Sequence, residues 1–578
     1  ETPSRGGAVV IDPNEFSADG TVAMSGYDVS PNGRHVAYST SDGGTDWDTW
    51  RIRNVAGGAD LPEVIDGTKF TEMAWLPDGS GVYYSRYPKN DGGGYDDQQT
   101  VKVFLHRLGE PVADDAMVYE ETEYPRANPY AAVGDDGRFL IVTLFDGYET
   151  NAIRVRRLGE EGSEDLRPFP DWTARYEFLG NDGDTLFFLT TADAPRGRVI
   201  AVDAGDDAAP RTVVPQSSAA IDEAAKVGDE IVVSFLRDVK SAIERYALDG
   251  EFVADVELPG EGSAAGLATG TETGETYFSF ATFTSPQAIY RLDLASGETS
   301  LVRAPDYALD PDDYSVSQTF INSADGTLIP LWLIHRQSLT RDGDNPTLLY
   351  GYGGFNISLT PWFNAAHMLW VDMGGLLAIP NLRGGGEYGQ AWHQAGTKLD
   401  KQNVFDDFVA AARWLIDNDY TTSERLAAMG RSNGGLLVGA TMTQAPDLFA
   451  ATLPGVGVLD MLRYHTASAN ARAWSSDYGL SEDAEEFGAL RAYSPLHNVV
   501  YGTCYPATLV TTANLDDRVV PWHSYKFGAA LQAAQGCDNP VLVRVETRAG
   551  HGAGKPKWMR IEDYADQLAF LVKHLGLD

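Results

Sequence analysis

The sequence predicts two domains of different classes, a β-propeller followed by a mostly parallel α/β domain. The 578 residues exceed the usual size of one domain, and 43% of them are hydrophobic, enough for two cores. A turn-and-strand unit recurs through the first three hundred residues, whereas apolar runs alternate with helical patterns after Pro305. We therefore expect a propeller over residues 1–305 and an α/β domain over residues 306–578.

The repeated unit of the first half is a polar turn with a glycine, followed by an aromatic or β-branched run. Asn-Gly and Asp-Gly between alternating apolar residues are typical of hairpins. A spacing of about 45 to 60 residues suits one four-stranded blade per unit, and it favours a propeller over a pair of β-sandwiches. Six units are visible and the chain begins within the repeats, so we expect an incomplete first blade. The turn glycines are Gly33, Gly79, Gly137, Gly183, Gly228 and Gly274.

The second half alternates short apolar strands with amphipathic helices. Apolar runs begin at Thr347 and Leu376, and each ends in glycines. Apolar residues recur at helical spacing from Val404, and the tail from Ile561 has the pattern of a closing helix. This order indicates a parallel sheet that is covered on both faces.

The composition excludes several classes of function. The chain has 83 acidic and 44 basic residues and a net charge of −39, which argues against nucleic acid as a partner. It has no apolar run long enough to span a membrane, no H-E-x-x-H and no Cys/His cluster with zinc spacing. We expect a soluble protein without metal or cofactor. The acidic, lysine-poor composition suits either a salt-rich source or ordinary acidic solubility.

Two cysteines, Cys504 and Cys537, each precede an apolar run. If these runs form neighbouring parallel strands, both thiols lie at the same end of the sheet and a bridge is geometrically allowed. The alternative is two free thiols. A bridge favours an oxidising compartment such as the periplasm over the cytoplasm.

The pentapeptide Gly430 to Gly434 fits the pattern G-x-S-x-G around Ser432. An apolar run precedes it and a helix-forming run follows it, which is the context of a nucleophile at a strand-to-helix turn. The glycines let the backbones pack closely, and the N–H of Asn433 points to a developing oxyanion. A serine hydroxyl in this role needs a neighbouring base.

In this type of fold the chain order should be the serine, then the acid, then the histidine base. His551 lies in a glycine-rich loop directly after an apolar run, where catalytic groups of open α/β sheets gather. His497, His523 and His574 fit turns, caps or a surface helix better.

The acid is expected after an earlier strand. The run that begins at Ala507 ends in two aspartates, Asp516 and Asp517. One should accept the N–H of His551, and the other suits a turn cap. The residues alone do not choose between them.

With these residues identified, the chain resembles the prolyl oligopeptidase family of serine peptidases. The resemblance implies a seven-bladed propeller over an α/β-hydrolase domain, with the active site facing the cavity between them. It also implies a monomeric endopeptidase that cuts proline-containing oligopeptides after proline. The resemblance rests on YGYGGFNISLTP (350–361), NLRGGGEYG (381–389), KQNVFDDF (401–408), SNGGLLVGA (432–440), DDRVVPWHSYKF (516–527) and AGHGAGKP (549–556).

The resemblance also assigns roles to individual residues. It implies Asp516 as the acid, Tyr352 as an oxyanion-hole hydroxyl beside the N–H of Asn433, and Arg518 as the group that binds a substrate carbonyl. The pocket for proline contains no acidic residue, which argues against cleavage after Lys or Arg. Its implied lining is Phe355, Val456, Val458, Trp474, Tyr478 and Val519.

Two departures from the family and two alternative functions stay open. Arg431 stands where the family usually has glycine. The resemblance also leads us to expect a further N-terminal segment of the family that is not among these 578 residues. A dipeptidyl or acylaminoacyl peptidase would need a motif that recognises a peptide's N-terminus, and we find none. A non-catalytic propeller protein with a relic hydrolase would be expected to lack one of the three catalytic residues.

Overall fold

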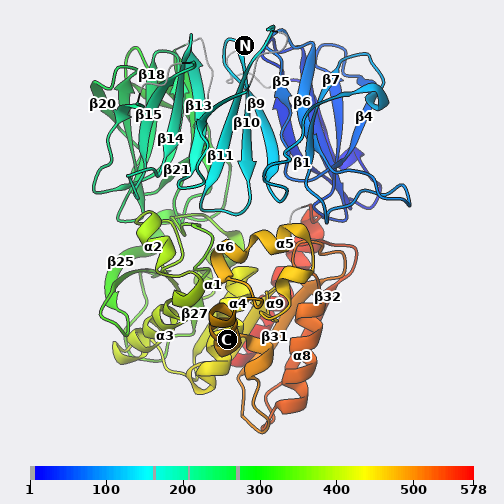
Figure 1. The fold of residues 1–578 in the computed structure, drawn as a ribbon. Coiled ribbons are helices and arrows are strands. Elements are labelled where there is room, and N and C mark those ends of the chain that lie inside the picture. Colours follow the sequence, from blue (N-terminus) through cyan, green and yellow to red (C-terminus); the bar gives the residue numbers. More distant parts are fainter. Residues whose placement is uncertain (1–6, 161–164, 206–208, 268–273, 553, 578) are drawn as a thin grey trace.

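The computed structural model describes residues 7–160, 165–205, 209–267, 274–552 and 554–577. It shows a propeller lying over an α/β-hydrolase domain, with the helices α2, α5 and α6 on the side that faces the propeller (Figure 1). The last propeller strand ends at Arg303 and the first hydrolase strand begins at Tyr314.

The propeller's described residues form six antiparallel sheets of four strands each. The first three blades are β1 (Val22–Val29), β2 (His35–Asp42), β3 (Asp48–Asn54) and β4 (Asp60–Thr68); β5 (Ala74–Trp75), β6 (Gly81–Arg86), β7 (Lys102–Arg107) and β8 (Ala116–Tyr119); and β9 (Asn128–Val133), β10 (Phe139–Phe145), β11 (Asn151–Arg157) and β12 (Leu166–Phe169). The next three are β13 (Tyr176–Asp182), β14 (Thr185–Thr190), β15 (Arg198–Asp203) and β16 (Arg211–Val214); β17 (Ala220–Val227), β18 (Glu230–Arg237), β19 (Lys240–Ala247) and β20 (Phe252–Val256); and β21 (Ser263–Ala265), β22 (Glu275–Ala281), β23 (Ala288–Asp293) and β24 (Thr299–Arg303).

The predicted turn glycines connect the first two strands of each blade. All six have φ between 57° and 73°, the left-handed region that glycine adopts without a steric cost. The hairpin pattern therefore located every blade correctly.

The expectation of an incomplete first blade within a seven-bladed propeller is not confirmed, because the first sheet has all four strands. The sequence pattern marked β2, but it missed β1, whose residues alternate weakly between apolar and polar. The described residues of the propeller give six blades.

The second domain has an eight-stranded sheet of order β25-β26-β28-β27-β29-β30-β31-β32. The pairs β25–β26 and β26–β28 are antiparallel and the others are parallel, as the predicted fold requires. The strands are β25 (Tyr314–Asn322), β26 (Leu328–Arg336), β27 (Thr347–Tyr350), β28 (Leu376–Pro380), β29 (Leu426–Arg431), β30 (Ala451–Gly455), β31 (Ala507–Ala513) and β32 (Val541–Glu546).

Helices cover both faces of this sheet. On one face Phe405 and Leu437 join the core, and on the other Trp370 and Phe570 do so. The helices are α1 (Ala365–Asp372), α2 (Gln390–Gln394), α3 (Gln402–Asp417), α4 (Asn433–Gln444), α5 (Ala469–Ala473), α6 (Ser475–Tyr478), α7 (Ala484–Tyr493), α8 (Trp522–Ala534) and α9 (Lys557–Leu575). Among the described residues, no helix combines the length and apolar character that crossing a bilayer requires.

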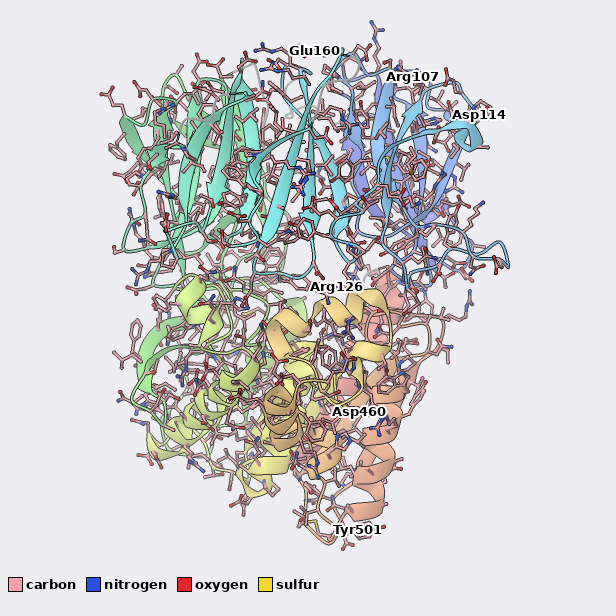
Figure 2. All side chains as sticks on the ribbon, in the orientation of Figure 1. Arg107, Asp114, Arg126, Glu160, Asp460 and Tyr501 are labelled. Atoms are coloured by element: carbon pink, nitrogen blue, oxygen red, sulfur yellow. A yellow bond between two sulfur atoms is a disulfide. The ribbon has the colours of Figure 1, made fainter. Side chains whose placement is uncertain are left out.

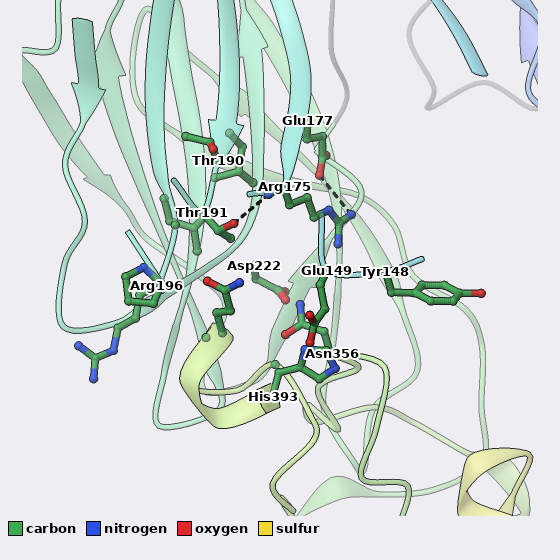
Figure 3. Close-up of a pocket in the computed structure, with 17 residues that line it drawn as sticks. Tyr148, Glu149, Arg175, Glu177, Thr190, Thr191, Arg196, Asp222, Asn356 and His393 are labelled. Carbon is green, nitrogen blue, oxygen red and sulfur yellow. Dashed lines mark hydrogen bonds and ion pairs between the residues drawn. The ribbon is translucent and has the colours of Figure 1, made fainter. Parts of the chain in front are cut away.

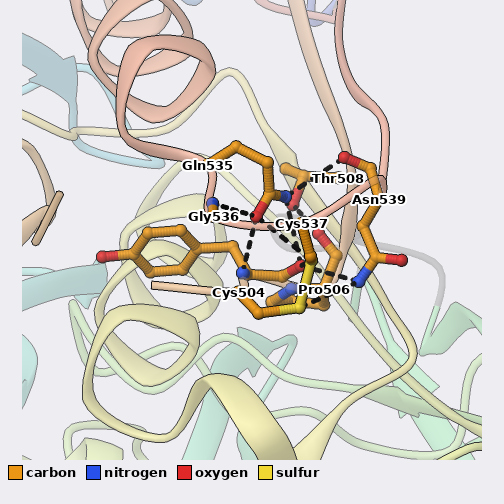
Figure 4. The surroundings of a disulfide bond; sticks show 8 residues. Cys504, Pro506, Thr508, Gln535, Gly536, Cys537 and Asn539 are labelled. Atoms are coloured by element: carbon orange, nitrogen blue, oxygen red, sulfur yellow. Dashed lines mark hydrogen bonds between the residues drawn. A yellow bond between two sulfur atoms is a disulfide. The ribbon is translucent and has the colours of Figure 1, made fainter. Parts of the chain in front are cut away.

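The two cysteines form a disulfide (Figure 4). Cys504 precedes β31 and Cys537 precedes β32, and the two strands pair in parallel, so both sulfurs meet at the same end of the sheet. The bridge closes a loop of 33 residues that contains α8.

Replacing both cysteines, Cys504→Ser and Cys537→Ser, should destabilise the hydrolase domain by roughly 2–4 kcal/mol, because the bridge restricts the unfolded chain. Urea unfolding followed by near-ultraviolet circular dichroism would measure the change. The oxidised wild type with and without reductant is the matched comparison. Equal unfolding midpoints in all samples would contradict the expectation.

Candidate active site

Ser432 lies on a sharp turn between β29 and α4, with φ 58° and ψ −117°. Non-glycine residues rarely adopt this conformation, and close packing holds it here. A Cβ on Gly430 would lie 2.4 Å from the carbonyl oxygen of Gly434, and a Cβ on Gly434 would lie 2.6 Å from that of Gly351. The turn therefore requires glycine at both positions.

His551 and Asp516 meet at the carboxyl ends of neighbouring strands. His551 follows β32 and Asp516 follows β31, and His551 Nδ1 lies 2.8 Å from Asp516 Oδ2. The other oxygen of Asp516 accepts hydrogen bonds from the backbone N–H groups of Arg518, at 3.2 Å, and Val519, at 2.8 Å. The buried carboxylate is thus fixed on both sides, and it orients the imidazole.

Asp517 has a different place from the turn cap that the sequence suggested. The cap of this turn is Asp516 itself. Asp517 points to the propeller, where Oδ1 accepts from the N–H of Asp46 at 2.9 Å and Oδ2 contacts Lys69 Nζ at 2.8 Å. The structure therefore brings Asp516, not Asp517, to His551.

Arg431, the departure from the family pattern, contacts the loop of His551 and the helix α9. Its Nη2 donates to the carbonyl oxygen of His551 at 3.3 Å, and its Nη1 lies 3.9 Å from the carboxylate of Asp563. The extra cation therefore contacts the backbone of the histidine loop.

Two groups near Ser432 are candidates for donating to an oxyanion. The Tyr352 side chain lies near Ser432. Burial and the charge of Asp477 raise the pKa of this phenol, and the neighbouring Ser432 lowers it in part. Tyr352 therefore stays protonated and able to donate. Asn433 is the first residue of α4, so its backbone N–H has no acceptor within the helix.

The residues expected to line a proline pocket gather beside this turn. Phe355, Val458, Trp474, Tyr478 and Val519 belong to one apolar cluster. The rings of Phe355 and Tyr478 are edge to face, with centroids 5.3 Å apart. Val456 is also buried, on the loop that follows β30, and its N–H donates to the Thr511 carbonyl oxygen at 2.7 Å.

A cavity of about 580 Å³ continues from this pocket to the propeller. Trp474 and Arg518 line it from the hydrolase domain. Its propeller residues were missed by sequence reasoning, since nothing in a blade's hairpin pattern marks the loop that will face another domain. The aromatic ones among them are Phe70, Tyr130, Phe145 and Tyr148.

A second cavity, of about 110 Å³, lies between the propeller and α2 (Figure 3). Glu149 and Asp222 enter it from the blades, and Asn356 and His393 enter it from the hydrolase domain. Burial raises the pKa of Asp222 to about 6. Within the described part of the chain, no three His, Cys, Asp or Glu side chains lie close enough to hold a metal ion.

Charged side chains join the domains directly at the active site. Arg518 makes a bidentate ion pair with Asp46 of the propeller, at 2.9 and 2.6 Å. Lys69 lies between Asp517 and Asp97, at 2.8 and 2.9 Å. Burial would lower the pKa of Lys69, but the two carboxylates raise it overall, so the side chain is charged.

Comparisons with known proteins agree along the whole chain. Residues 1–305 match the family model described as the prolyl oligopeptidase N-terminal beta-propeller domain, and residues 361–578 match that of the prolyl oligopeptidase family. The prolyl endopeptidase of Elizabethkingia meningoseptica is 40% identical over 98% of this chain and 81% of its own length.

Solved structures show the same similarity. A structure from a study of two prolyl endopeptidases and their inter-domain dynamics superposes with a TM-score of 0.95, at 38% identity, over 99% of this chain and 84% of that one. Prolyl oligopeptidase B of Galerina marginata, bound to a 25mer macrocyclization substrate, superposes with a TM-score of 0.92. It is 32% identical, over 98% of this chain and 82% of that one.

Replacing Lys69 with methionine should loosen the contact between the domains, because Asp517 and Asp97 lose their shared cation. Removing one partner of a buried pair costs about 2–5 kcal/mol, and the partial exposure of these carboxylates puts the cost near the lower limit. The radius of gyration from small-angle X-ray scattering should rise. Lys102→Met is the control, since Lys102 pairs with Glu120 inside one blade; equal scattering of both variants would refute the role of Lys69.

Proposed function

Because the chain belongs to the prolyl oligopeptidase family of serine peptidases, we propose that it hydrolyses short peptides on the carboxyl side of proline through an acyl-enzyme on Ser432. The observation that carries the proposal is the bond between His551 and Asp516 beside the strained turn of Ser432. The full-length similarity to proteins named prolyl endopeptidase supports the specificity.

The mechanism follows from which nitrogen of the His551 imidazole carries the hydrogen. Nδ1–H of His551 donates to Asp516, so Nε2 is the base that removes the proton from Ser432 Oγ. The oxygen attacks the carbonyl carbon of the prolyl residue, and the resulting oxyanion accepts hydrogen bonds from Tyr352 and the N–H of Asn433. His551 then protonates the leaving amine. Water hydrolyses the ester by the same steps, and Ser432 is regenerated.

Specificity rests on the shape and polarity of the pocket. Proline offers an apolar ring and no N–H, which matches the aromatic faces of Trp474 and Phe355 and the aliphatic walls of Val456, Val458 and Val519. Tyr478 closes the pocket. Arg518 binds a carbonyl of the substrate backbone and also pairs with Asp46, so substrate and propeller share one guanidinium.

The propeller, residues 1–305, acts as the gate of the catalytic domain, residues 306–578. The cavity between them is small enough to exclude folded proteins and admits proline-containing oligopeptides. We expect a monomer without cofactor. The disulfide favours a periplasmic or other oxidising location. A propeller of seven blades stays a prediction from the family.

Ser432→Ala should abolish cleavage of an N-blocked glycyl-prolyl amide, with a loss of about 10⁶ in kcat, while the thermal unfolding stays unchanged. A fluorophosphonate should label the wild type at one residue and leave the variant unlabelled, because only an activated serine reacts quickly. Absence of labelling in the wild type would favour the non-catalytic propeller protein.

An N-blocked peptide reporter should be cleaved at least as well as the same peptide with a free amino group. A reporter with alanine in place of proline should lose at least tenfold in kcat/KM, since it fills less of the pocket. Mass spectrometry of a mixed peptide digest identifies the residue before each cut. A requirement for a free or acylated terminal residue would instead indicate a dipeptidyl or acylaminoacyl peptidase.

A further inference from the structure

The loop of residues 352–356 carries groups of two sites, the oxyanion hole and the proline pocket. Tyr352 lies against Ser432, and Phe355 packs against Tyr478. Phe355 and Asn356 both have φ of 57°, in the left-handed region that non-glycine residues rarely occupy. Such a conformation persists only where the surroundings impose it.

Three side chains hold the backbone of this loop. The carboxylate of Asp477 accepts from the N–H of Phe355 at 3.0 Å. Lys401 Nζ donates to the carbonyl oxygen of Gly353 at 3.1 Å, and Asn433 Nδ2 donates to that of Tyr352 at 2.6 Å. The other side of the loop is closed by glycines: a Cβ on Gly384 would lie 2.9 Å from the Gly353 oxygen.

Two of these side chains form a buried ion pair. Lys401 Nζ lies 2.9 Å from Asp477 Oδ2, and each side chain is 1% exposed. Burial opposes ionisation of Asp477, but the charge of Lys401 and the hydrogen bond with His393 outweigh it and lower the pKa of the carboxyl. A buried ion pair adds little to stability compared with apolar packing, which suggests that this one serves geometry.

His393 completes the network on the side of the interdomain cavity. Its Nε2 lies 2.8 Å from Asp477 Oδ1, the same oxygen that holds Phe355. The ring also lines the cavity between the domains, where Asn356 is its neighbour (Figure 3). The buried carboxylate is therefore fixed by one cation, one imidazole and one backbone N–H.

Asp477 also belongs to the proline pocket by its position in the chain. It stands in α6 directly before Tyr478 and three residues after Trp474. The Tyr478 hydroxyl donates to Asn433 Oδ1 at 2.9 Å, and Asn433 in turn holds the loop. The wall of the proline pocket and loop 352–356 are thus connected in two ways, one through Asp477 and one through Tyr478.

We propose that Asp477, balanced by Lys401, is a positioning residue that holds loop 352–356 so that the Tyr352 hydroxyl faces the oxyanion. It touches no reacting atom. Its carboxylate fixes the backbone N–H of Phe355, and Lys401 fixes the carbonyl of Gly353, so both contacts hold the segment that directly follows Tyr352. The inference rests on the proposed peptidase activity and concerns how its transition state is stabilised.

The test compares Asp477→Asn with wild type on the N-blocked glycyl-prolyl amide. Asparagine keeps an oxygen for Phe355 but removes the charge that orients Lys401 and His393. We expect kcat to fall by about 10²-fold, close to the loss of one oxyanion donor, with KM changed less than threefold. Lys401→Met should likewise lower kcat by about 10²-fold and change KM less than threefold.

Two ligands separate positioning from general damage to the pocket. An N-blocked peptide ending in prolinal is attacked by Ser432 Oγ at its aldehyde carbon, and the resulting hemiacetal oxygen enters the oxyanion hole. The same peptide ending in prolinol cannot add. In Asp477→Asn the aldehyde should lose affinity by the same factor as kcat, while prolinol keeps its affinity within threefold. An equal loss for both ligands would overturn the proposal in favour of a pocket role.

A matched control lies elsewhere in the hydrolase domain. Asp460, which is labelled in Figure 2, is fully buried and pairs with Lys526, whose side chain is 40% exposed. Asp460→Asn should change the unfolding temperature without changing kcat. If it lowers kcat as Asp477→Asn does, the effect is general destabilisation and the proposal fails.

If Asp477→Asn is too unstable to test, a second variant still tests the proposal. The double variant Asp477→Asn with Lys401→Met removes both buried charges and should recover stability but not kcat. Recovery of kcat as well would overturn the proposal. A wild type that neither labels with fluorophosphonate nor cleaves after proline would instead refute the proposed function, so the two failures are distinguishable.

Discussion

The close approach of backbones around Ser432 is the constraint on which the rest of the site depends. Gly430, Gly434 and Gly351 touch at distances that no side chain would permit, and this contact brings the strand β29, the helix α4 and the oxyanion loop together. Every other group is then placed relative to that turn. The loop with Tyr352 lies on one side of the Ser432 turn, and the loops after β31 and β32, which carry Asp516 and His551, lie on the other.

Sequence reasoning found the local features and missed the contacts between distant segments. The turn glycines located all blades, and G-x-S-x-G located the nucleophile turn, because each feature is defined within a few residues. Asp46 and Arg518 are 472 positions apart, and Lys69 and Asp517 are 448 apart, so no local pattern could pair them. The first blade was expected to be incomplete because its first strand, β1, has too little alternation of apolar and polar residues to be recognised alone.

Three cations of this strongly acidic chain hold the active site and the contact between the domains. Lys401 is buried under the oxyanion loop, Lys69 lies between two carboxylates at the domain interface, and Arg518 reaches across to Asp46. Lys69 pairs with two carboxylates that would otherwise repel one another, and Lys401 and Arg518 each pair with one. The surplus of negative charge on the surface therefore coexists with an active site whose charges are individually balanced.

The disulfide lies at the opposite end of the two strands that deliver the acid and the base. Cys504 and Cys537 join the beginnings of β31 and β32, whereas Asp516 and His551 follow their ends. The covalent link therefore joins the starts of two parallel strands whose ends lead to a hydrogen-bonded pair, His551 and Asp516. One bond, remote from the substrate, thereby stabilises the two strands that carry both the acid and the base, without either sulfur touching them.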